Sequence, residues 1–187
     1  ITNVEFVIVD GTLEILKRAV TLTSADDEKV YDGKPLTNDE VAVTGAGFVA
    51  GEGATYDVTG TQTAVGLSAN AFTYTLNSNT KADNYTITKV EGTLKVTELT
   101  DKVTVTITEH SSKETYNGTE KTVTGYDVEI SNPLYTEADF TFSGNATVTG
   151  TDAGTYDMFL NPADFKNTSA NITNVEFVIV DGTLEIL

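Results

Sequence analysis

The segment ITNVEFVIVDGTLEIL occupies residues 1–16, and residues 172–187 repeat it letter for letter. Sixteen identical positions at an offset of 171 are not a coincidence, so we expect a piece of a longer tandem array, with an engineered duplication as the alternative. In each copy an apolar run, an Asp-Gly pair and a Thr-Leu-Glu-Ile run predict a β-hairpin. We expect residues 1–16 to form an exposed hairpin, or to exchange with residues 172–187 of another molecule.

A second, diverged repeat lies inside this period. Gly-Thr-Leu recurs at residues 92–94 and 182–184. The spacing from Val-Thr-Leu-Thr at residues 20–23 to Tyr31-Asp32-Gly33 equals the spacing from Val-Thr-Ile-Thr at residues 105–108 to Tyr116-Asn117-Gly118. The sequence therefore predicts a terminal strand segment at residues 1–16, a first β module at residues 17–98 and a second at residues 99–187. Modules of this size can each bury a small core.

Strand patterns dominate both modules. Val103 to Thr108 alternates apolar and polar residues, as does Phe72 to Leu76. About seven short strands in each module, separated by turn signals, are typical of a sandwich. The segment Asp152-Ala153-Gly154-Thr155-Tyr156 fits the Asp-x-Gly-x-Tyr corner of immunoglobulin-type sandwiches, with Tyr156 as the corner residue. We predict an all-β chain of two tandem immunoglobulin-like β-sandwich modules, with β-grasp-like units as the alternative.

The charge and the residue usage of the chain exclude several functions. Its 28 acidic residues against 11 basic ones give a formal net charge of −17. Nucleic acids and anionic membrane surfaces attract basic faces, so we expect neither as a partner. The absence of cysteine excludes thiolate chemistry and disulfides, and a single histidine leaves little room for a histidine triad or a multi-histidine metal site. We expect no catalytic residue, no metal site, no cofactor and no enzyme activity.

Several short motifs contain residue types that could form a site. Three carboxylate clusters could supply oxygens to calcium, but none has EF-hand spacing, so we interpret them as solvated loop charge. They are Asp26-Asp27-Glu28, Asn38-Asp39-Glu40 and Glu52 to Asp57. The two Tyr-Asp/Asn-Gly triplets are interpreted as structural turns, and His110 as a surface loop residue. Lys95 and Lys102 are candidates for an internal Lys–Asn amide bond.

The first module carries the nine-residue motif Lys29-Val30-Tyr31-Asp32-Gly33-Lys34-Pro35-Leu36-Thr37, and later Gly92-Thr93-Leu94-Lys95-Val96. These motifs resemble the YDG/MBG-type tandem repeat modules of bacterial cell-surface, adhesin-like proteins. The second module departs from the pattern, because Tyr116-Asn117-Gly118 replaces Tyr-Asp-Gly and no proline follows. The resemblance implies a secreted, extracellular and non-enzymatic module at the cell surface or cell wall of a Gram-positive bacterium.

The expected function is that of a structural spacer, which extends or presents an adhesive region and has the adjacent repeats of the same protein as partners. The alternative is an adhesin module that binds a host glycoprotein, mucin or glycan. Five aromatic residues could make such contacts, although we favour a place in the core for them. They are Tyr56, Tyr126, Tyr135, Phe140 and Phe142.

Overall fold

Residues 2–187, which a computed structural model describes, form β-strands joined by turns and loops and contain no α-helix. Three short 3-10 turns each lead directly into a strand: η1 (Ala82–Asn84), η2 (Glu137–Asp139) and η3 (Pro162–Asp164). Within the described range, no helix combines the length and the apolar character needed to cross a membrane. The prediction of an all-β chain is confirmed.

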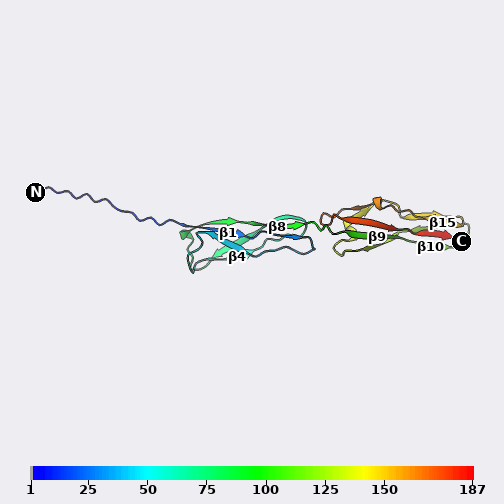
Figure 1. The fold of residues 1–187 in the computed structure, drawn as a ribbon, viewed down its shortest axis with the longest axis horizontal. Helices are drawn as coiled ribbons and strands as arrows, with labels where there is room; N and C mark the ends of the chain where they lie inside the picture. The colour runs from blue at the N-terminus through cyan, green and yellow to red at the C-terminus, as the bar shows by residue number, and fades with distance from the viewer. Residues whose placement is uncertain (1) are drawn as a thin grey trace. The chain divides into compact units, whose positions relative to one another are not determined.

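The first repeat contains eight strands in three small sheets, and Figure 1 labels β1, β4 and β8 among them. The eight strands are β1 (Arg18–Ser24), β2 (Asp27–Val30), β3 (Val41–Gly45), β4 (Ala54–Val58), β5 (Gly66–Asn70), β6 (Phe72–Leu76), β7 (Tyr85–Val90) and β8 (Gly92–Thr97). β1 pairs antiparallel with β3 and parallel with β7, while β4 pairs antiparallel with β6. A third small sheet has the order β2-β8-β5. Inward-facing Val20, Leu22, Phe72 and Tyr85 form the core.

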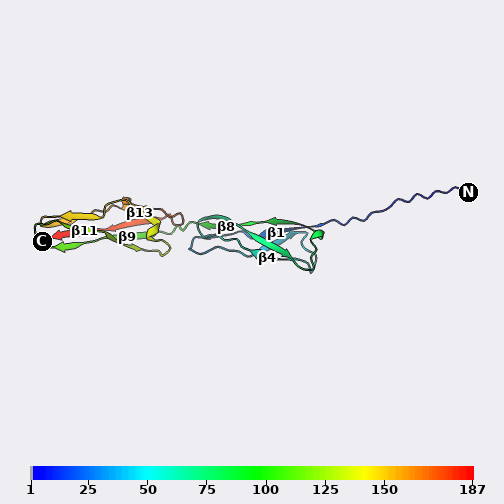
Figure 2. The same cartoon turned by 180° about the vertical axis from the view of Figure 1, so that it is seen from behind.

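The second repeat likewise consists of small sheets, one of which has β9 as its central strand. Figure 2 shows β9, β11 and β13 from the opposite side. The strands of this repeat are β9 (Val103–Glu109), β10 (Ser112–Glu114), β11 (Lys121–Thr124), β12 (Tyr126–Ile130), β13 (Phe140–Phe142), β14 (Thr147–Gly150), β15 (Gly154–Asp157), β16 (Phe165–Asn167), β17 (Val175–Val180) and β18 (Thr183–Ile186). β9 pairs antiparallel with β12 and parallel with β17. β18 lies between β10, to which it is parallel, and the antiparallel β15. Two antiparallel pairs, β11–β14 and β13–β16, complete the repeat.

The core of the second repeat follows from the alternation in its central strand. Val103, Val105 and Ile107 of β9 are fully buried, whereas the threonines between them are not. Leu184 and Ile186 of β18 meet them in the same core. Strand periodicity therefore predicted the buried face correctly.

Several small mixed and antiparallel sheets, packed around apolar cores, make the fold sandwich-type. A β-grasp-like unit needs an α-helix packed on its sheet, and residues 2–187 contain none. The predicted tyrosine corner is confirmed, because the Tyr156 hydroxyl donates a hydrogen bond to the Asp152 carbonyl oxygen at 3.0 Å.

The prediction of a hairpin at Asp181-Gly182 is wrong. β17 and β18 belong to different sheets and do not pair with each other, so the chain passes there from one sheet to the other. Gly182 lies against the neighbouring backbone: a Cβ atom at this position would be 2.4 Å from the His110 carbonyl oxygen. Gly92 occupies the same place in the first repeat, where a Cβ atom would be 2.4 Å from the Ser24 carbonyl oxygen. We call these two places the crossovers; their glycines are needed for close approach rather than for a turn.

The hairpin predicted at Asp10-Gly11 is also wrong for the part of it that the structure describes, since Ile1 lies outside the described residues. Residues 2–16 contain no strand and are exposed. A Cβ atom on Gly11 would meet nothing within 4 Å. The physical reason is that this sequence forms strands in residues 172–187 only by pairing with other strands of its repeat.

Contacts divide the chain into two compact units. The first contains residues up to Asp27, Thr37–Thr61 and Ser68–Leu94. The second contains Glu28–Leu36, Gln62–Leu67 and Lys95–Leu187, so that short segments from the sequence of the first repeat belong to it. The modules at residues 17–98 and 99–187 therefore stay a prediction drawn from the repeat.

Candidate functional site

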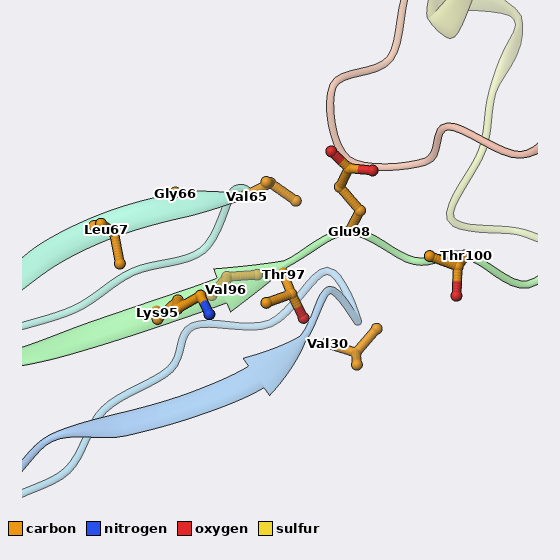
Figure 3. Close-up of a pocket in the computed structure, with 9 residues that line it drawn as sticks. All are labelled: Val30, Val65, Gly66, Leu67, Lys95, Val96, Thr97, Glu98 and Thr100. Atoms are coloured by element: carbon orange, nitrogen blue, oxygen red, sulfur yellow. The ribbon is translucent and has the colours of Figure 1, made fainter.

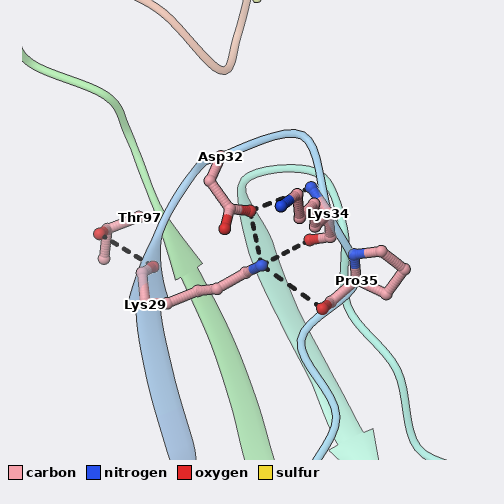
Figure 4. Close-up of polar contacts among 5 residues, drawn as sticks. All are labelled: Lys29, Asp32, Lys34, Pro35 and Thr97. Carbon is pink, nitrogen blue, oxygen red and sulfur yellow. Dashed lines mark hydrogen bonds and ion pairs between the residues drawn. The ribbon is translucent and has the colours of Figure 1, made fainter.

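The Tyr31-Asp32-Gly33 triplet closes a turn after β2, as Figure 4 shows. The Asp32 carboxylate accepts a hydrogen bond from the Lys34 backbone N–H at 3.0 Å, which is the geometry of an Asx turn. The Lys29 ammonium donates to the same carboxylate oxygen at 2.6 Å and to the Lys34 carbonyl oxygen at 2.6 Å. Gly33 has a φ of +75°, which glycine adopts without strain. The Asp32 carboxylate and the Lys29 ammonium thus bond within the turn, while the Tyr31 backbone N–H donates to the Thr97 carbonyl oxygen of β8 at 2.8 Å.

The hydrogen bond from Lys29 lowers the pKa of the Asp32 carboxyl group below its usual value, with a second contribution from the Lys34 backbone N–H. Both interactions favour the charged carboxylate. A surface carboxylate that stays ionised and is already bound by its neighbours is suited to holding a turn, and it offers no proton for acid catalysis.

The counterpart turn, Tyr116-Asn117-Gly118, keeps this geometry without the charges. The Asn117 side-chain oxygen accepts from the Thr119 backbone N–H at 3.1 Å, and Gly118 has a φ of +76°. Glu114 occupies the position that corresponds to Lys29. The Glu114 carboxylate accepts from the Ser112 hydroxyl at 2.7 Å, so the second turn has no counterpart of the Lys29–Asp32 ion pair.

The two tyrosines of these turns differ in their surroundings. Tyr31 packs against the core of the second compact unit, and a Cβ atom on Gly33 would lie 3.0 Å from Leu134 Cδ2. A hydrogen bond from the Val65 backbone N–H to the Asn171 side-chain oxygen, at 2.8 Å, joins another segment of the first repeat's sequence to the same unit. Tyr116, in contrast, is 52% exposed. The interpretation of both triplets as structural turns agrees with this geometry.

One surface depression of about 580 Å³ lies in the second compact unit (Figure 3). Its lining consists of the ends of β2, β5 and β8 with the segment that follows: Val30, Val65, Gly66, Leu67, Lys95, Val96, Thr97, Glu98 and Thr100. Lys95 forms an ion pair with Glu28 at 3.0 Å, and the Glu98 carboxylate accepts a hydrogen bond from the Thr173 hydroxyl at 3.0 Å. Both charged side chains of the lining are thus engaged with groups outside it, Lys95 with Glu28 and Glu98 with Thr173.

A buried carboxylate lies at the second crossover, and sequence analysis missed it. Glu109 is the last residue of β9 and is 3% exposed. One of its oxygens accepts from the Leu160 backbone N–H at 2.6 Å, and the other from the Gly182 backbone N–H at 2.8 Å. Because both oxygens are used for backbone amides, Glu109 fastens the crossover to the loop before η3. Its inward register in β9 was the one signal that could have revealed it.

Residues of two of the three carboxylate clusters make local hydrogen bonds. Asp26 accepts from the Thr93 backbone N–H at 2.6 Å, and the Asn38 amide donates to Asp27 at 3.1 Å. Among residues 2–187, no group of three or more His, Asp or Glu side chains could hold a metal ion. Lys95 and Lys102, the candidates for an internal amide, are instead in surface ion pairs, the latter with Glu176 at 2.5 Å.

The five candidate contact aromatics pack into the two cores. Tyr135 and Phe140 are buried in the core of the second repeat, and Tyr126 and Phe142 pack against it. Tyr56 packs against the core of the first repeat. The Tyr135 hydroxyl lies 3.0 Å from the Asp139 carbonyl oxygen and 3.0 Å from the Asn167 side-chain oxygen. Burial raises the pKa of Tyr135 to about 12, with a smaller contribution from the negative charge of Asp139.

Phe159 was not among the candidate contact aromatics. It is 78% exposed although Met158 and Leu160 on either side are buried. Its φ of 58° lies in the left-handed region, where a bulky side chain is strained. An isolated exposed phenylalanine in a strained backbone conformation has no role in the core.

Comparison with known proteins identifies one stretch of the chain. Residues 102–186 match the family model of the MBG domain. No curated protein and no solved structure matches the chain. The match covers the second repeat, although the intact Tyr-Asp-Gly triplet lies in the first. The resemblance to YDG/MBG-type modules is thus confirmed, and it extends over β9 to β18.

Proposed function

The second repeat of this chain is an MBG domain, a repeat module of surface proteins, and on that premise we propose that the chain is a load-bearing structural spacer. In this proposal the chain is extracellular, belongs to a surface or cell-wall protein of a Gram-positive bacterium, and extends or presents an adhesive region. Its partners are the adjacent repeats of the same protein. It performs no catalysis and uses no cofactor.

The pairing of each repeat's first strand supports this proposal. β9 is the first strand of the second repeat, and it pairs in parallel with the penultimate strand β17 from Val103↔Val175 to Thr108↔Val180. β1 and β7 make the corresponding parallel pair in the first repeat. Each repeat therefore joins its beginning to its end by one continuous hydrogen-bonded ladder.

Parallel pairing matters because tension enters a tandem module at opposite ends of these two strands. Pulling on the start of β9 and on the end of β18 slides β9 along β17, so the ladder hydrogen bonds are loaded together rather than one after another. Forced unfolding is governed by the unfolding rate. A barrier that requires many bonds to break at once keeps that rate small, which is what a spacer under tension requires.

Single-molecule force spectroscopy with two attachment geometries tests the proposal. The sequence has no cysteine, so introduced cysteines define the attachment points. Asp101→Cys with Leu187→Cys loads β9 and β17 in shear, whereas Asp101→Cys with Thr173→Cys pulls on neighbouring ends of the same strands and unzips them. We expect the second repeat to unfold at a clearly higher force in the first geometry. Equal forces in the two geometries would contradict a load-bearing role.

The location is tested separately from the mechanics. We expect an antibody raised against residues 17–187 to label intact cells, and brief protease treatment of those cells to remove the label. Labelling that requires permeabilised cells would place the chain inside and would contradict the surface assignment.

A contact role is the second candidate function, and Phe159 is the observation that favours it. Strain at a non-glycine residue collects at functional sites, and here it holds an aromatic ring in solvent. The partner class for this candidate is a host glycoprotein, mucin or glycan. Phe159→Gly removes the ring and relieves the left-handed strain, so stability should hold or rise by about 1 kcal/mol.

Immobilised mucin provides the test for this second candidate. We expect wild type to be retained and Phe159→Gly to be lost, with Val49→Gly, another exposed loop substitution, as the matched control. If wild type passes through unretained, the contact role fails and the spacer proposal is untouched.

A further inference from the structure

The repeated 16-residue sequence exists here in two environments. In residues 172–187 it supplies β17 and β18, with Leu184 and Ile186 buried. In residues 2–16 the same sequence has no strand, and its Phe6 and Leu13 are 87% and 88% exposed. One copy is therefore integrated in a core while an identical one presents the same apolar side chains to solvent.

The side-chain contacts of the integrated copy define what the exposed copy can fit. Phe177 packs on Phe165, with ring centroids 5.5 Å apart, and on Phe140 at 5.3 Å. Glu185 forms an ion pair with Lys113 at 3.0 Å. The residues at the matching positions of the exposed copy are Phe6 and Glu14. Each of these contacts can be made equally well by residues 2–16.

The backbone contacts are as specific as those of the side chains. The segment from Val175 to Val180 pairs in parallel with β9, and β18 is held between β10 and β15. At the crossover the Gly182 N–H donates to Glu109, and the Thr183 N–H donates to the Ser111 hydroxyl at 3.0 Å. Gly11 and Thr12 hold these positions in the exposed copy. The crossover admits only glycine, which both copies have.

We infer that residues 2–16 are a donor segment, which takes the place of β17 and β18 in the second repeat of another copy of this chain. The acceptor is the body formed by β9 to β16 when its own residues 172–187 are displaced. This is strand addition between two molecules with an identical segment, so the exchanged and the resident contacts are the same. The inference rests on the duplicated sequence and its contacts and not on the spacer function.

Competition with the resident segment determines when exchange occurs. Residues 172–187 are tethered to their site, and a tether of this kind supplies an effective concentration on the order of millimolar. At micromolar concentration the intact chain is therefore expected to keep its own segment and remain monomeric. A substitution that ejects the resident segment and spares the donor should convert the chain into an assembling one.

A single glycine makes this substitution possible in the full chain. Gly182→Val places side-chain atoms against the His110 and Glu109 backbone, where even a Cβ atom would be 2.4 Å and 2.5 Å from the two carbonyl oxygens. Residues 2–16 of a neighbouring chain still carry Gly11 and can fill the site. We expect Gly182→Val to form species of at least twice the monomer mass by light scattering, growing with concentration.

Two matched variants isolate the donor. Gly11→Val alone should stay monomeric with unchanged stability, because nothing lies within 4 Å of a Cβ atom at Gly11. Gly11→Val combined with Gly182→Val should lose the assembly, since neither copy then fits the crossover. Glu14→Cys with Lys113→Cys, added to Gly182→Val, should form a disulfide between chains, because this pair takes the place of Glu185 and Lys113.

Each remaining outcome counts against the inference. A monomeric Gly182→Val chain overturns it, whether its second repeat is unfolded or closed by its own residues 2–16. Equal assembly of the double Gly11/Gly182 variant shows non-specific association of an unfolded repeat and overturns it as well. Assembly of Gly182→Val without the Glu14–Lys113 cross-link rejects the proposed register.

Discussion

Glu109 occupies the place in the second repeat that Ser24 occupies in the first, and each accepts the hydrogen bond of its crossover glycine. The Gly92 N–H donates to the Ser24 hydroxyl at 2.9 Å, and the Gly182 N–H donates to the Glu109 carboxylate at 2.8 Å. Ser24 also donates to the Asn70 carbonyl oxygen at 2.5 Å, whereas Glu109 also accepts from Leu160. Two unrelated side chains therefore satisfy the equivalent buried amide of each repeat, and each also bonds to a distant backbone group, at the end of β5 for Ser24 and in the loop before η3 for Glu109.

The first prediction concerns this buried amide. We expect Glu109→Ala to lower the free energy of unfolding of the second repeat by about 3 kcal/mol, because it leaves the N–H groups of Leu160 and Gly182 buried without acceptors. Ser24→Ala removes the acceptor of the Gly92 N–H and the donor to the Asn70 carbonyl oxygen, but both bonds are to a neutral hydroxyl rather than to a charged carboxylate, so it should cost about 1–2 kcal/mol. Urea denaturation of both variants measures the difference. A cost for Glu109→Ala no larger than that for Ser24→Ala would mean that water replaces the carboxylate.

The second prediction concerns alkaline unfolding. The pKa of Tyr135 is raised to about 12 in the folded chain, against about 10 in an unfolded one. Its stabilising contribution is complete below pH 10 and is lost as the pH rises through 12, because the unfolded chain ionises first. Tyr135→Phe should flatten the loss of stability in this window and cost about 1 kcal/mol at neutral pH for its hydrogen bond. Denaturation curves between pH 7 and 12 measure both effects. If the free energy of unfolding falls with pH as steeply in Tyr135→Phe as in wild type, the alkaline loss of stability belongs to another tyrosine.

The third prediction uses the single histidine. His110 Nε2 lies 3.2 Å from the Asp127 carboxylate and Nδ1 lies 2.9 Å from the Thr124 carbonyl oxygen, so only the charged ring can donate to both. The bond to Asp127, followed by that to Thr124, raises the pKa of His110 above its usual value. This contribution to stability is complete below about pH 6.5 and is lost as the pH rises through the raised pKa. NMR titration of the imidazole should show a lower pKa in Asp127→Asn, and an identical pKa would exclude the pair.

The fourth prediction concerns acid. Because the pKa of Asp32 is lowered, its contribution to stability is present above about pH 3.9 and is lost as the pH falls through the lowered value. Lys29→Met should move the pKa of Asp32 back towards its usual value, as measured by carbon-detected NMR of the carboxyl group. Lys34→Met is the matched control, because Lys34 contacts Asp32 by its backbone N–H. Equal shifts in the two variants would show that general charge, and not the Lys29 hydrogen bond, sets the pKa.

Local sequence predicted the features whose cause is local. Asp32-Gly33 and Asn117-Gly118 form turns with positive φ because the two residues themselves supply the conformation and the side-chain acceptor. The tyrosine corner could likewise be predicted from sequence, since the Tyr156 hydroxyl donates to a carbonyl oxygen only four residues earlier in the chain. Alternation in β9 placed its valines and isoleucine in the core.

The remaining features depend on partners far away in the sequence. Asp181-Gly182 has the local pattern of a hairpin, and only the backbone of Glu109 and His110 turns it into a crossover. Residues 2–16 show the same dependence, because they have the sequence of residues 173–187 but form no strand without neighbouring strands to pair with. The burial of Glu109 was hidden by its charge, and the strained Phe159 carries no sequence signal that separates it from a core aromatic.

The parallel ladder between β9 and β17 also governs the order in which the second repeat can be made. Val103 and Val175 are 72 positions apart, and the strand that fills the core last, β18, ends at Ile186. Contacts of such long sequence separation slow folding, and a partly synthesised repeat has β9 without its partner. Until Leu184 and Ile186 have been synthesised, the core of the second repeat is incomplete. During that time Val103, Val105 and Ile107 are not covered by β17 and β18 and are exposed to aggregation.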